Sequence, residues 1–470
     1  MSATATTEKK YLKWYQKLAY GSGDLASNCS YGLVSSFVLL YLTGTLGLDS
    51  AIIGSLMLAS KVLDGISDVI FGTLIDRTHS KLGKARPWML FGQVGVSLCL
   101  FLLFAIPAGS TTMQYIYFFI VYTALNAVFY TANGIAYSSL VALITKNNNE
   151  RVQLGSFRFM FAVVTNIFMG FAVTGMVEKF GSGAAGWRTT ALIFAIIGLV
   201  VNTISCLAVK ELPEEELGDN TSEAAEEGKA VAEEKKHGFA ETAKVLVHNK
   251  YYLMILAIYI VYYIMSNLTT GAGVFCATYY WGDGSLLGQF SMMKMFPVII
   301  ALAIAPVLIK KTGSMQKVNF WGYAISSVLG IPMIYFAMQK NLSMFLLFMF
   351  IKGIFAGTLS GSLNALIAEA SGYTTRTTGI HMDGMMYSCS SLGVKVGGGI
   401  GTAAVGWLLK LGGFVGTATV QSESAIRMIF NLYITFPFVI GIIITVLLAF
   451  LDVEKANKKW DAEHKKEAQA

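Results

Sequence analysis

The feature that most constrains this chain is a succession of apolar segments, each long enough to cross a bilayer. A transmembrane helix needs about 20 mostly apolar residues, and twelve stretches meet that requirement. Only 13% of the residues are charged, against about a quarter in a soluble globular protein. We therefore expect an all-α membrane protein rather than a large soluble helical one. The predicted spans are residues 19–46, 52–76, 88–107, 113–143, 155–177, 187–210, 251–281, 286–310, 317–338, 343–368, 379–410 and 425–451.

Basic residues gather in alternate gaps between the predicted spans. They precede the first span, follow the second, fourth and eighth, and occupy the C-terminal tail, whereas the gap PAGSTTMQ after the third has no charge. Short cytoplasmic loops carry the excess of Lys and Arg in membrane proteins. Both termini are therefore predicted to be cytoplasmic, in a multi-pass protein of the cell inner (cytoplasmic) membrane. The first residues carry no cleavable signal pattern.

An acidic and polar segment divides the chain into two six-helix halves. It contains ELPEEELGDN and has the composition of a flexible linker. A weak repeat supports the division, since GTLIDRTHSKLGKARPW after the second span is similar to APVLIKKTGSMQKVNFW after the eighth. Similar halves are typical of transporters that rock around a central site. The predicted domains are a cytoplasmic N-terminus (1–18), an N-terminal bundle (19–210), a cytoplasmic linker (211–250), a C-terminal bundle (251–451) and a cytoplasmic tail (452–470).

Two acidic residues lie inside the second predicted span, in the stretch KVLDGISDVIFG. A charged side chain in a bilayer costs a few kcal/mol and normally faces the bundle interior. Asp64 and Asp68 are four residues apart and share one helix face, so they repel each other unless a positive group lies between them. Na⁺ prefers oxygen ligands, Ser67 adds a hydroxyl, and a proton could bind instead. The alternative is a structural salt bridge, for example between Asp64 and Lys61.

Further polar residues lie inside other spans, where amides, hydroxyls and polar aromatics could bind the hydroxyls of a sugar. Lys395 has no acid nearby in its own glycine-rich span, so its expected partner is Asp64 or Asp68 across the bundle. For the amides and for Tyr137, the alternative is a hydrogen bond between helices. The candidate substrate-binding residues are Asn28, Asp24, Asn133, Tyr137, Ser138, Lys395 and Arg158.

Several motifs along nearly the whole chain resemble those of one transporter family. They are YGSGD, KVLDGISD, DRTHSKLGKARPW, YTANGIAYSSLVALIT, ERVQLGSFR and TTGIHMDGMMYSCSSLGVKVGGGIG. The chain resembles the glycoside–pentoside–hexuronide:cation symporters, a branch of the major facilitator superfamily typified by the melibiose permease. The resemblance implies twelve transmembrane helices in two halves, and a substrate that is a sugar carried together with a cation.

Individual residues can be assigned roles from this resemblance. It implies a cation site, a Na⁺ site among the options, at Asp64, Asp68 and Thr131, with Ser67 beside them. It places Asn28 at the position of a sugar-binding acid of the family, Lys395 at that of a lysine close to the cation and sugar sites, and Arg158 at that of a cytoplasmic-side arginine.

The sequence also departs from the family pattern. The melibiose permease has a sugar-binding acid in its fourth helix, and Gly134 stands at that position here. Ser138 stands where that relative has a tryptophan. Melibiose is therefore a poor guess, and a hexuronide or a pentoside stays open.

Charged residues at the cytoplasmic ends of the spans are predicted to form pairs that hold that side shut during the transport cycle. Glu150 belongs to the same group of charges. His381 stands where the family has another basic residue, and an imidazole could add pH dependence. The candidate gating residues are Asp76, Arg77, Lys84, Arg86, Arg151, Glu369 and His381.

The sequence thus predicts alternating-access symport of a glycoside, pentoside or hexuronide with Na⁺ or H⁺, by a monomer that uses no cofactor and binds no nucleic acid. The alternatives are a cation-dependent carrier of lysolipids or other amphiphiles, an uncoupled sugar facilitator, and a non-transporting sensor. An enzyme is disfavoured, because the sequence lacks a nucleophile elbow, a metal-ligand spacing and a phosphate-binding glycine loop.

Overall fold

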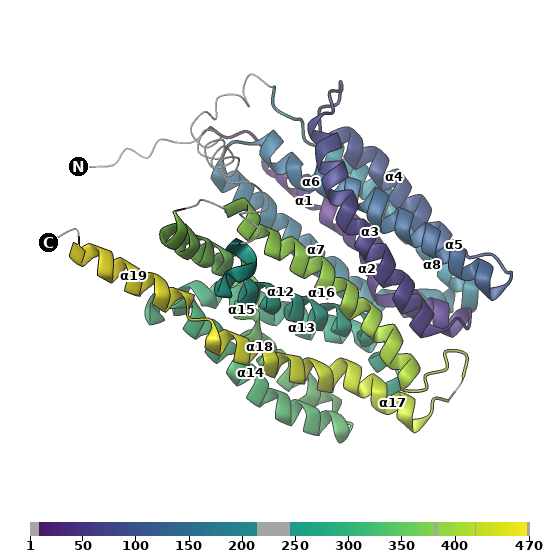
Figure 1. The fold of residues 1–470 in the computed structure, drawn as a ribbon. Coiled ribbons are helices and arrows are strands. Elements are labelled where there is room, and N and C mark those ends of the chain that lie inside the picture. Colours follow the sequence, from purple (N-terminus) through teal and green to yellow (C-terminus); the bar gives the residue numbers. More distant parts are fainter. Residues whose placement is uncertain (1–8, 214–244, 380–382, 419, 468–470) are drawn as a thin grey trace. The chain divides into compact units, whose positions relative to one another are not determined.

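The computed structural model describes residues 9–213, 245–379, 383–418 and 420–467, and every regular element in those ranges is a helix (Figure 1). The all-α prediction is therefore confirmed. The helices of the N-terminal half are α1 (Trp14–Gly21), α2 (Gly23–Leu40), η1 (Tyr41–Thr45), α3 (Ser50–Asp76), α4 (Arg86–Leu103), α5 (Thr111–Thr123), η2 (Ala124–Tyr130), α6 (Thr131–Ile144), α7 (Asn148–Lys179) and α8 (Gly183–Leu207). Those of the C-terminal half are α12 (Lys250–Phe275), η3 (Cys276–Tyr280), α13 (Leu286–Thr312), α14 (Met315–Met338), α15 (Leu342–Thr378), α16 (Asp383–Leu411), α17 (Glu423–Phe430), η4 (Asn431–Thr435), α18 (Phe436–Phe450) and α19 (Val453–Glu467).

Eleven helical segments among the described residues are long and apolar enough to cross a membrane. Several join consecutive helices, as in the segment Trp14–Thr45, which combines α1, α2 and η1. The predicted span 52–76 corresponds to α3, which is not one of the eleven. It has 27 residues, so it is about 40 Å long at 1.5 Å per residue, and it carries Lys61, Asp64 and Asp68.

Polar side chains begin many of these helices, and they satisfy backbone N–H groups that have no partner within the helix. Asp49 accepts hydrogen bonds from the amides of Ala51 and Ile52 at the start of α3. Ser110 caps α5, Asn147 caps α7 and Asn341 caps α15 in the same way.

The chain forms two compact units. Unit 1 contains residues 1–219 together with two short pieces of the C-terminal half, 273–289 and 406–426, and unit 2 contains the rest. The predicted domain boundaries stay a prediction.

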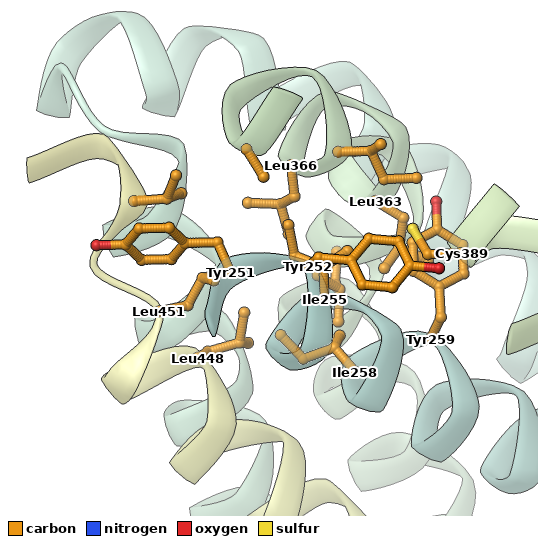
Figure 2. Packing of buried hydrophobic residues seen from close by; sticks show 14 of the residues in the cluster. Tyr251, Tyr252, Ile255, Ile258, Tyr259, Leu363, Leu366, Cys389, Leu448 and Leu451 are labelled. Atoms are coloured by element: carbon orange, nitrogen blue, oxygen red, sulfur yellow. The ribbon is translucent and has the colours of Figure 1, made fainter. Parts of the chain in front are cut away.

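Unit 2 has a core of buried aromatic and aliphatic side chains that joins at least five of its helices. Tyr252 and Tyr259 of α12 pack with Leu366 of α15, Cys389 of α16 and Leu448 of α18 (Figure 2). The same cluster includes Tyr323 of α14. Within a bilayer, such a cluster stabilises the bundle through van der Waals packing between helices. This core packs the helices of unit 2 against one another.

Candidate functional site

The predicted cation residues Asp64 and Thr131 come together in unit 1. The Thr131 hydroxyl Oγ1 donates a hydrogen bond to the Asp64 carboxylate Oδ1 over 2.6 Å, between α3 and the first residue of α6. Lys61 Nζ lies 3.5 Å from the other carboxylate oxygen of Asp64. Both members of that ion pair are largely buried. The structure therefore contains the Lys61–Asp64 pair that the sequence offered as the structural alternative, and also the Asp64–Thr131 contact.

Local backbone geometry fixes the position of Thr131. The preceding residues form the π-helical segment η2, and its Asn126 carbonyl lies 2.9 Å from Thr131 Oγ1. A π-helical turn has i to i+5 hydrogen bonds and occurs frequently at functional sites. The hydroxyl has one proton, so it donates to Asp64 or to Asn126 at any one time. A ligand that bound Asp64 could therefore displace this hydroxyl without leaving it unpaired.

Ser67 and Asp68 complete the predicted cation set on α3. The Ser67 hydroxyl donates to the Asp64 backbone carbonyl at 2.9 Å, so it is engaged within its own helix. Asp68 is partly buried one turn beyond Asp64. The cation site itself stays a prediction.

Lys61 is a residue that the site prediction did not include. Its Nζ lies 5.7 Å from the centroid of the Tyr31 ring, and Tyr31 stacks on Tyr130 at 5.3 Å. The ammonium group is therefore placed between the carboxylate of Asp64 and an aromatic face, both of which attract cations. An intramembrane lysine three residues before an acid was visible in the sequence, but its aromatic neighbour on α2 was not.

A second polar cluster joins α2, α6 and α7. Arg158 Nε lies 2.6 Å from Asp24 Oδ2, in an ion pair whose side chains are only 26% and 17% exposed. The Arg158 guanidinium also lies 4.2 Å from the centroid of the Tyr137 ring. The Tyr137 hydroxyl donates to the Tyr20 carbonyl at 2.8 Å and lies 3.4 Å from Asp24 Oδ2. Three of the predicted substrate residues are thus in direct contact.

Asn28 extends this cluster along α2. Its amide nitrogen donates to the Asp24 carbonyl at 2.7 Å, and its amide oxygen accepts from Asn166 of α7 at 2.9 Å. Asn166 was not predicted, although it lies eight residues after Arg158 and therefore on the same helix face. That spacing is the signal that could have identified it.

Two other predicted substrate residues lie elsewhere. Asn133 is 2% exposed, and its amide nitrogen donates to Gln93 of α4 at 2.8 Å. This is the hydrogen bond between helices that the sequence offered as the alternative. Ser138 of α6 is exposed. The substrate role of both residues stays a prediction, and the described contacts favour the cluster around Asp24.

Lys395 lies on α16 in unit 2 and is partly buried. The helix passes close to α12 because its glycines leave room. A Cβ atom at Gly393 would overlap Tyr259, and one at Gly397 would overlap the Ile260 carbonyl. Small residues allow such close packing between membrane helices. The pairing of Lys395 with an acid of unit 1 stays a prediction.

The predicted gating residues are held mainly by backbone groups. Arg86 Nε donates to the Cys206 carbonyl at 3.2 Å, and Arg151 Nε donates to the Thr145 carbonyl at 3.1 Å. The Glu369 carboxylate accepts from Asn457 of α19 at 2.9 Å. Asp76 and Arg77 are exposed at the end of α3, and His381 lies outside the described residues. The gating roles stay predictions.

An unpredicted carboxylate organises the loop before α4. The Glu211 side chain accepts hydrogen bonds from the amides of Lys84, Ala85 and Arg86 at 2.7, 3.0 and 3.1 Å. An anion at a helix N-terminus is stabilised by such N–H groups and by the helix dipole. Gly83 has φ +112°, and a Cβ atom there would overlap this carboxylate. Glycine is therefore required at position 83 for both conformational and steric reasons.

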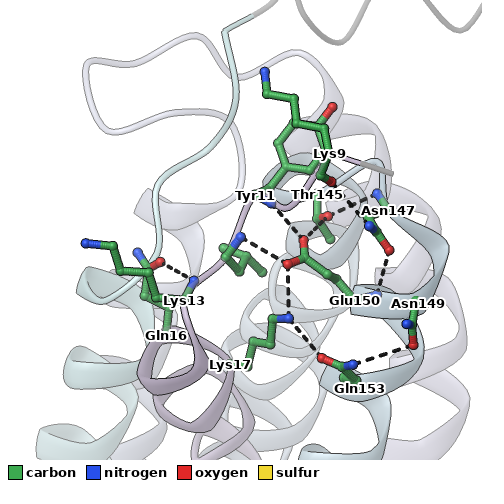
Figure 3. A network of polar contacts seen from close by, with 11 residues as sticks. Lys9, Tyr11, Lys13, Gln16, Lys17, Thr145, Asn147, Asn149, Glu150 and Gln153 are labelled. Carbon is green, nitrogen blue, oxygen red and sulfur yellow. Dashed lines mark hydrogen bonds and ion pairs between the residues drawn. The ribbon is translucent and has the colours of Figure 1, made fainter. Parts of the chain in front are cut away.

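Glu150, near the start of α7, ties the N-terminal segment to the N-terminal bundle (Figure 3). Its buried carboxylate accepts from the amides of Tyr11 and Leu12 at 3.1 and 3.2 Å, and from Thr145 Oγ1 at 2.7 Å. Lys17 Nζ lies 3.0 Å from the same carboxylate. Glu150 was expected among the gating charges, and its described partners all belong to the N-terminal half.

An ion pair that the sequence did not predict joins the two sequence halves inside unit 1. Lys410, near the end of α16, lies 2.6 Å from Asp49 Oδ2, next to the start of α3. The Ser50 hydroxyl donates to the Gly406 carbonyl at 2.9 Å, and Trp407 Nε1 donates to Ser55 Oγ at 3.0 Å. These contacts fasten the last turns of α16 to the first turns of α3.

The Asp49–Lys410 contact should make stability depend on pH. The hydrogen bond from Lys410, assisted by the amides of Ala51 and Ile52, lowers the pKa of Asp49. Because the pKa of Asp49 is lower in the folded state, the contact stabilises the folded protein at pH values above the unfolded-state pKa of about 3.9. This stabilisation is lost as the pH falls through the pKa of Asp49 in the folded state. The Lys410→Met variant should therefore unfold at a slightly lower temperature than wild type at pH 7. This difference in unfolding temperature should become smaller below pH 4.

Thermal unfolding of the purified protein across this pH range measures that difference. Asp49→Asn is the matched variant, since asparagine keeps the helix cap and removes the charge. A gap between wild type and Lys410→Met that stayed constant from pH 7 to pH 3 would contradict the assignment.

Comparison with known proteins places these features in context. A family model described as MFS/sugar transport protein matches residues 19–455. The isoprimeverose transporter of Lactiplantibacillus pentosus is 26% identical over 459 residues, covering 97% of this chain and 92% of the relative. The putative glycoside/cation symporter YagG of Escherichia coli (strain K12) is 24% identical, covering 94% and 92%. The crystal structure of a D-xylose–proton symporter has a TM-score of 0.64 at 12% identity, covering 94% of this chain and 98% of that one. These findings confirm the resemblance and the fold of the major facilitator superfamily.

Proposed function

Since this chain belongs to the MFS/sugar transport protein family, we propose that it carries a glycoside, pentoside or hexuronide across the membrane together with Na⁺ or H⁺. It is a multi-pass membrane transporter and not an enzyme. We further propose that α3 also crosses the membrane and brings the number of transmembrane helices to twelve. The protein would lie in the inner membrane with both termini in the cytoplasm. We also propose that the monomer is the working unit.

The contact between Asp64 and Thr131 is the observation that carries cation coupling. It joins the Asp64 carboxylate of α3 to the Thr131 hydroxyl of α6. A cation bound by Asp64, with Asp68 one turn away, would neutralise this charge and compete with Lys61, whose 3.5 Å distance to Asp64 is long for a strong ion pair. Cation binding would thereby change how α3 is held against its neighbours.

The cluster of Asp24, Asn28 and Arg158 is the proposed sugar site in unit 1. Amide, carboxylate and guanidinium groups can donate to and accept from several hydroxyls at once. The ring of Tyr137 beneath the guanidinium adds an aromatic face. Lys395 of α16 stays a predicted substrate residue.

Tyr31 offers a physical connection between the two sites. It lies on α2, three residues after Asn28, and its ring contacts Lys61 and Tyr130. A cation that displaced Lys61 from Asp64 would change the environment of this ring and of α2. Coupling of this kind is reciprocal, so each ligand would raise the affinity of the other.

Uptake into proteoliposomes tests the proposal. The purified chain would be offered radiolabelled isoprimeverose, methyl β-D-xyloside and methyl β-D-glucuronide, each with an inward Na⁺ gradient, an inward H⁺ gradient or no gradient. We expect at least one sugar to accumulate above its external concentration with one of the two gradients. An ionophore that collapses the gradient should abolish the accumulation.

Other outcomes would identify the alternatives. Uptake that only equilibrates the sugar, whatever the gradient, would make the protein a facilitator. Absence of sugar uptake together with cation-dependent uptake of a lysolipid would overturn the sugar assignment.

A further inference from the structure

Unit 2 contains a cavity that neither the sequence motifs nor the proposed site uses. Its volume is about 190 Å³, and its walls come from α12, α13, α14, α15, η4 and α18. A cavity of about 150 Å³ accepts one benzene molecule, so this one has room for a single six-membered ring. All of its described lining residues belong to unit 2.

Two lysines line this cavity, Lys294 of α13 and Lys352 of α15. Both lie in the middle of apolar stretches, MMKMF and MFIKGIF, within segments apolar enough to cross a membrane. Each side chain is partly accessible, as expected for a group that lines a cavity. Intramembrane lysines are rare and usually mark a substrate or ion pathway.

The lysines have few partners among the described residues. Lys294 Nζ lies 3.3 Å from Thr269 Oγ1 and 3.2 Å from Thr270 Oγ1, and hydroxyls do not neutralise its charge. Within the described part of the chain, Lys352 has no hydrogen-bond or ion-pair partner. No described residue lining the cavity is an aspartate or a glutamate. Two ammonium groups without a carboxylate form a site of positive potential in a medium of low dielectric constant.

The remaining lining residues suit a hydroxylated ring. The Tyr262 hydroxyl and Ser360 Oγ are 2.7 Å apart, and Ser266 and Ser326 add further hydroxyl groups. Aromatic side chains complete the wall, among them Tyr323 and Tyr433. Apolar and aromatic walls with a few polar groups are typical of small-molecule sites.

We propose that this cavity binds the carboxylate-bearing ring of an acidic sugar, with Lys294 and Lys352 holding the carboxylate. The inference rests on the proposed function, since it makes sugar acids the preferred substrate class of this transporter. It assigns the charge selectivity to unit 2 and leaves the cation site in unit 1.

Binding of a matched pair of sugars tests the inference. Methyl β-D-glucuronide and methyl β-D-glucoside share one ring and differ in the carboxylate, and their binding to the purified full-length chain can be measured by calorimetry. We expect wild type to bind the glucuronide at least about tenfold more tightly, the equivalent of about one charge-assisted hydrogen bond. Lys352→Gln should remove this preference, and Lys294→Gln should reduce it.

Two further variants separate charge recognition from general damage. Lys352→Arg keeps the positive charge and should retain the preference for the glucuronide. Lys310→Gln removes an exposed charge at the end of α13, outside the cavity, and should behave as wild type. Elution of each variant as a single folded species on size-exclusion chromatography qualifies it for the comparison.

The outcomes distinguish this inference from the proposed function. Cation-driven uptake of the glucoside, with no preference for the glucuronide or a preference unchanged in Lys352→Gln, would overturn the inference and leave the symporter standing. Binding of the glucuronide that depends on Lys352, without any effect of a cation gradient on uptake, would support the inference and overturn cation coupling. Failure of wild type to bind either sugar would overturn the inference, whereas the proposed function would still be decided by the uptake of isoprimeverose and methyl β-D-xyloside.

Discussion

Asp64→Asn should abolish accumulation of sugar against its gradient while leaving the protein folded. Asparagine has nearly the same shape, and its amide oxygen can still accept the hydrogen bond from Thr131. What it lacks is the negative charge that would hold a cation or exchange a proton. We expect uptake to fall to simple equilibration, with no difference between an imposed cation gradient and none. Proteoliposome uptake, with exchange of internal for external sugar as the second readout, measures this.

Matched variants sharpen the test of Asp64. Glu178→Gln removes an exposed acid from the end of α7 and should leave accumulation unchanged. Thr131→Val should weaken the apparent cation affinity, and Thr131→Ser should restore it, because the hydroxyl is the group in contact with Asp64. Gradient-driven accumulation by Asp64→Asn at the wild-type level would make the Lys61–Asp64 pair structural.

Arg158→Met should be among the most destabilising single substitutions in unit 1. It would leave the Asp24 carboxylate without the guanidinium 2.6 Å away, in a largely buried position. Removing one partner of a buried ion pair costs about 3 kcal/mol or more, because the other charge stays unpaired. The loss should appear as a lower unfolding temperature and as loss of sugar uptake.

The double variant Asp24→Asn with Arg158→Met should recover much of the stability but not the uptake. Removing both charges relieves the unpaired carboxylate, whereas the sugar still lacks its donors and acceptors. Lys179→Met, which removes an exposed charge from the end of the same helix, controls for the loss of one positive charge. If the losses of stability in the two single variants simply added in the double variant, the two residues would not be coupled.

The all-helical fold and the approximate positions of the helices follow from the sequence, although eleven described segments, against twelve predicted spans, are long and apolar enough to cross a membrane. Hydropathy and helix signals are sums over neighbouring residues, so each segment specifies its own helix with little help from the rest of the chain. Lys61 and Asp64 are three residues apart, and one helix turn is enough to bring them together. The acids inside the second span identified Asp64, Asp68 and Ser67, and the family resemblance added Thr131. The structure adds the contact between Asp64 and Thr131.

Other contacts needed the tertiary structure. Asp24 and Arg158 are 134 residues apart, and nothing in either local sequence says that they face each other. Asn133 appeared as suitable for a sugar as Asn28, yet helix packing turns it toward Gln93. The charges of Lys294 and Lys352 were visible as interruptions of apolar segments, but the cavity that they share is built from six elements. Hydrophobicity decides that a helix crosses the membrane, whereas the rotation of each helix about its axis is set by side-chain packing against its neighbours, and that rotation decides which polar groups meet.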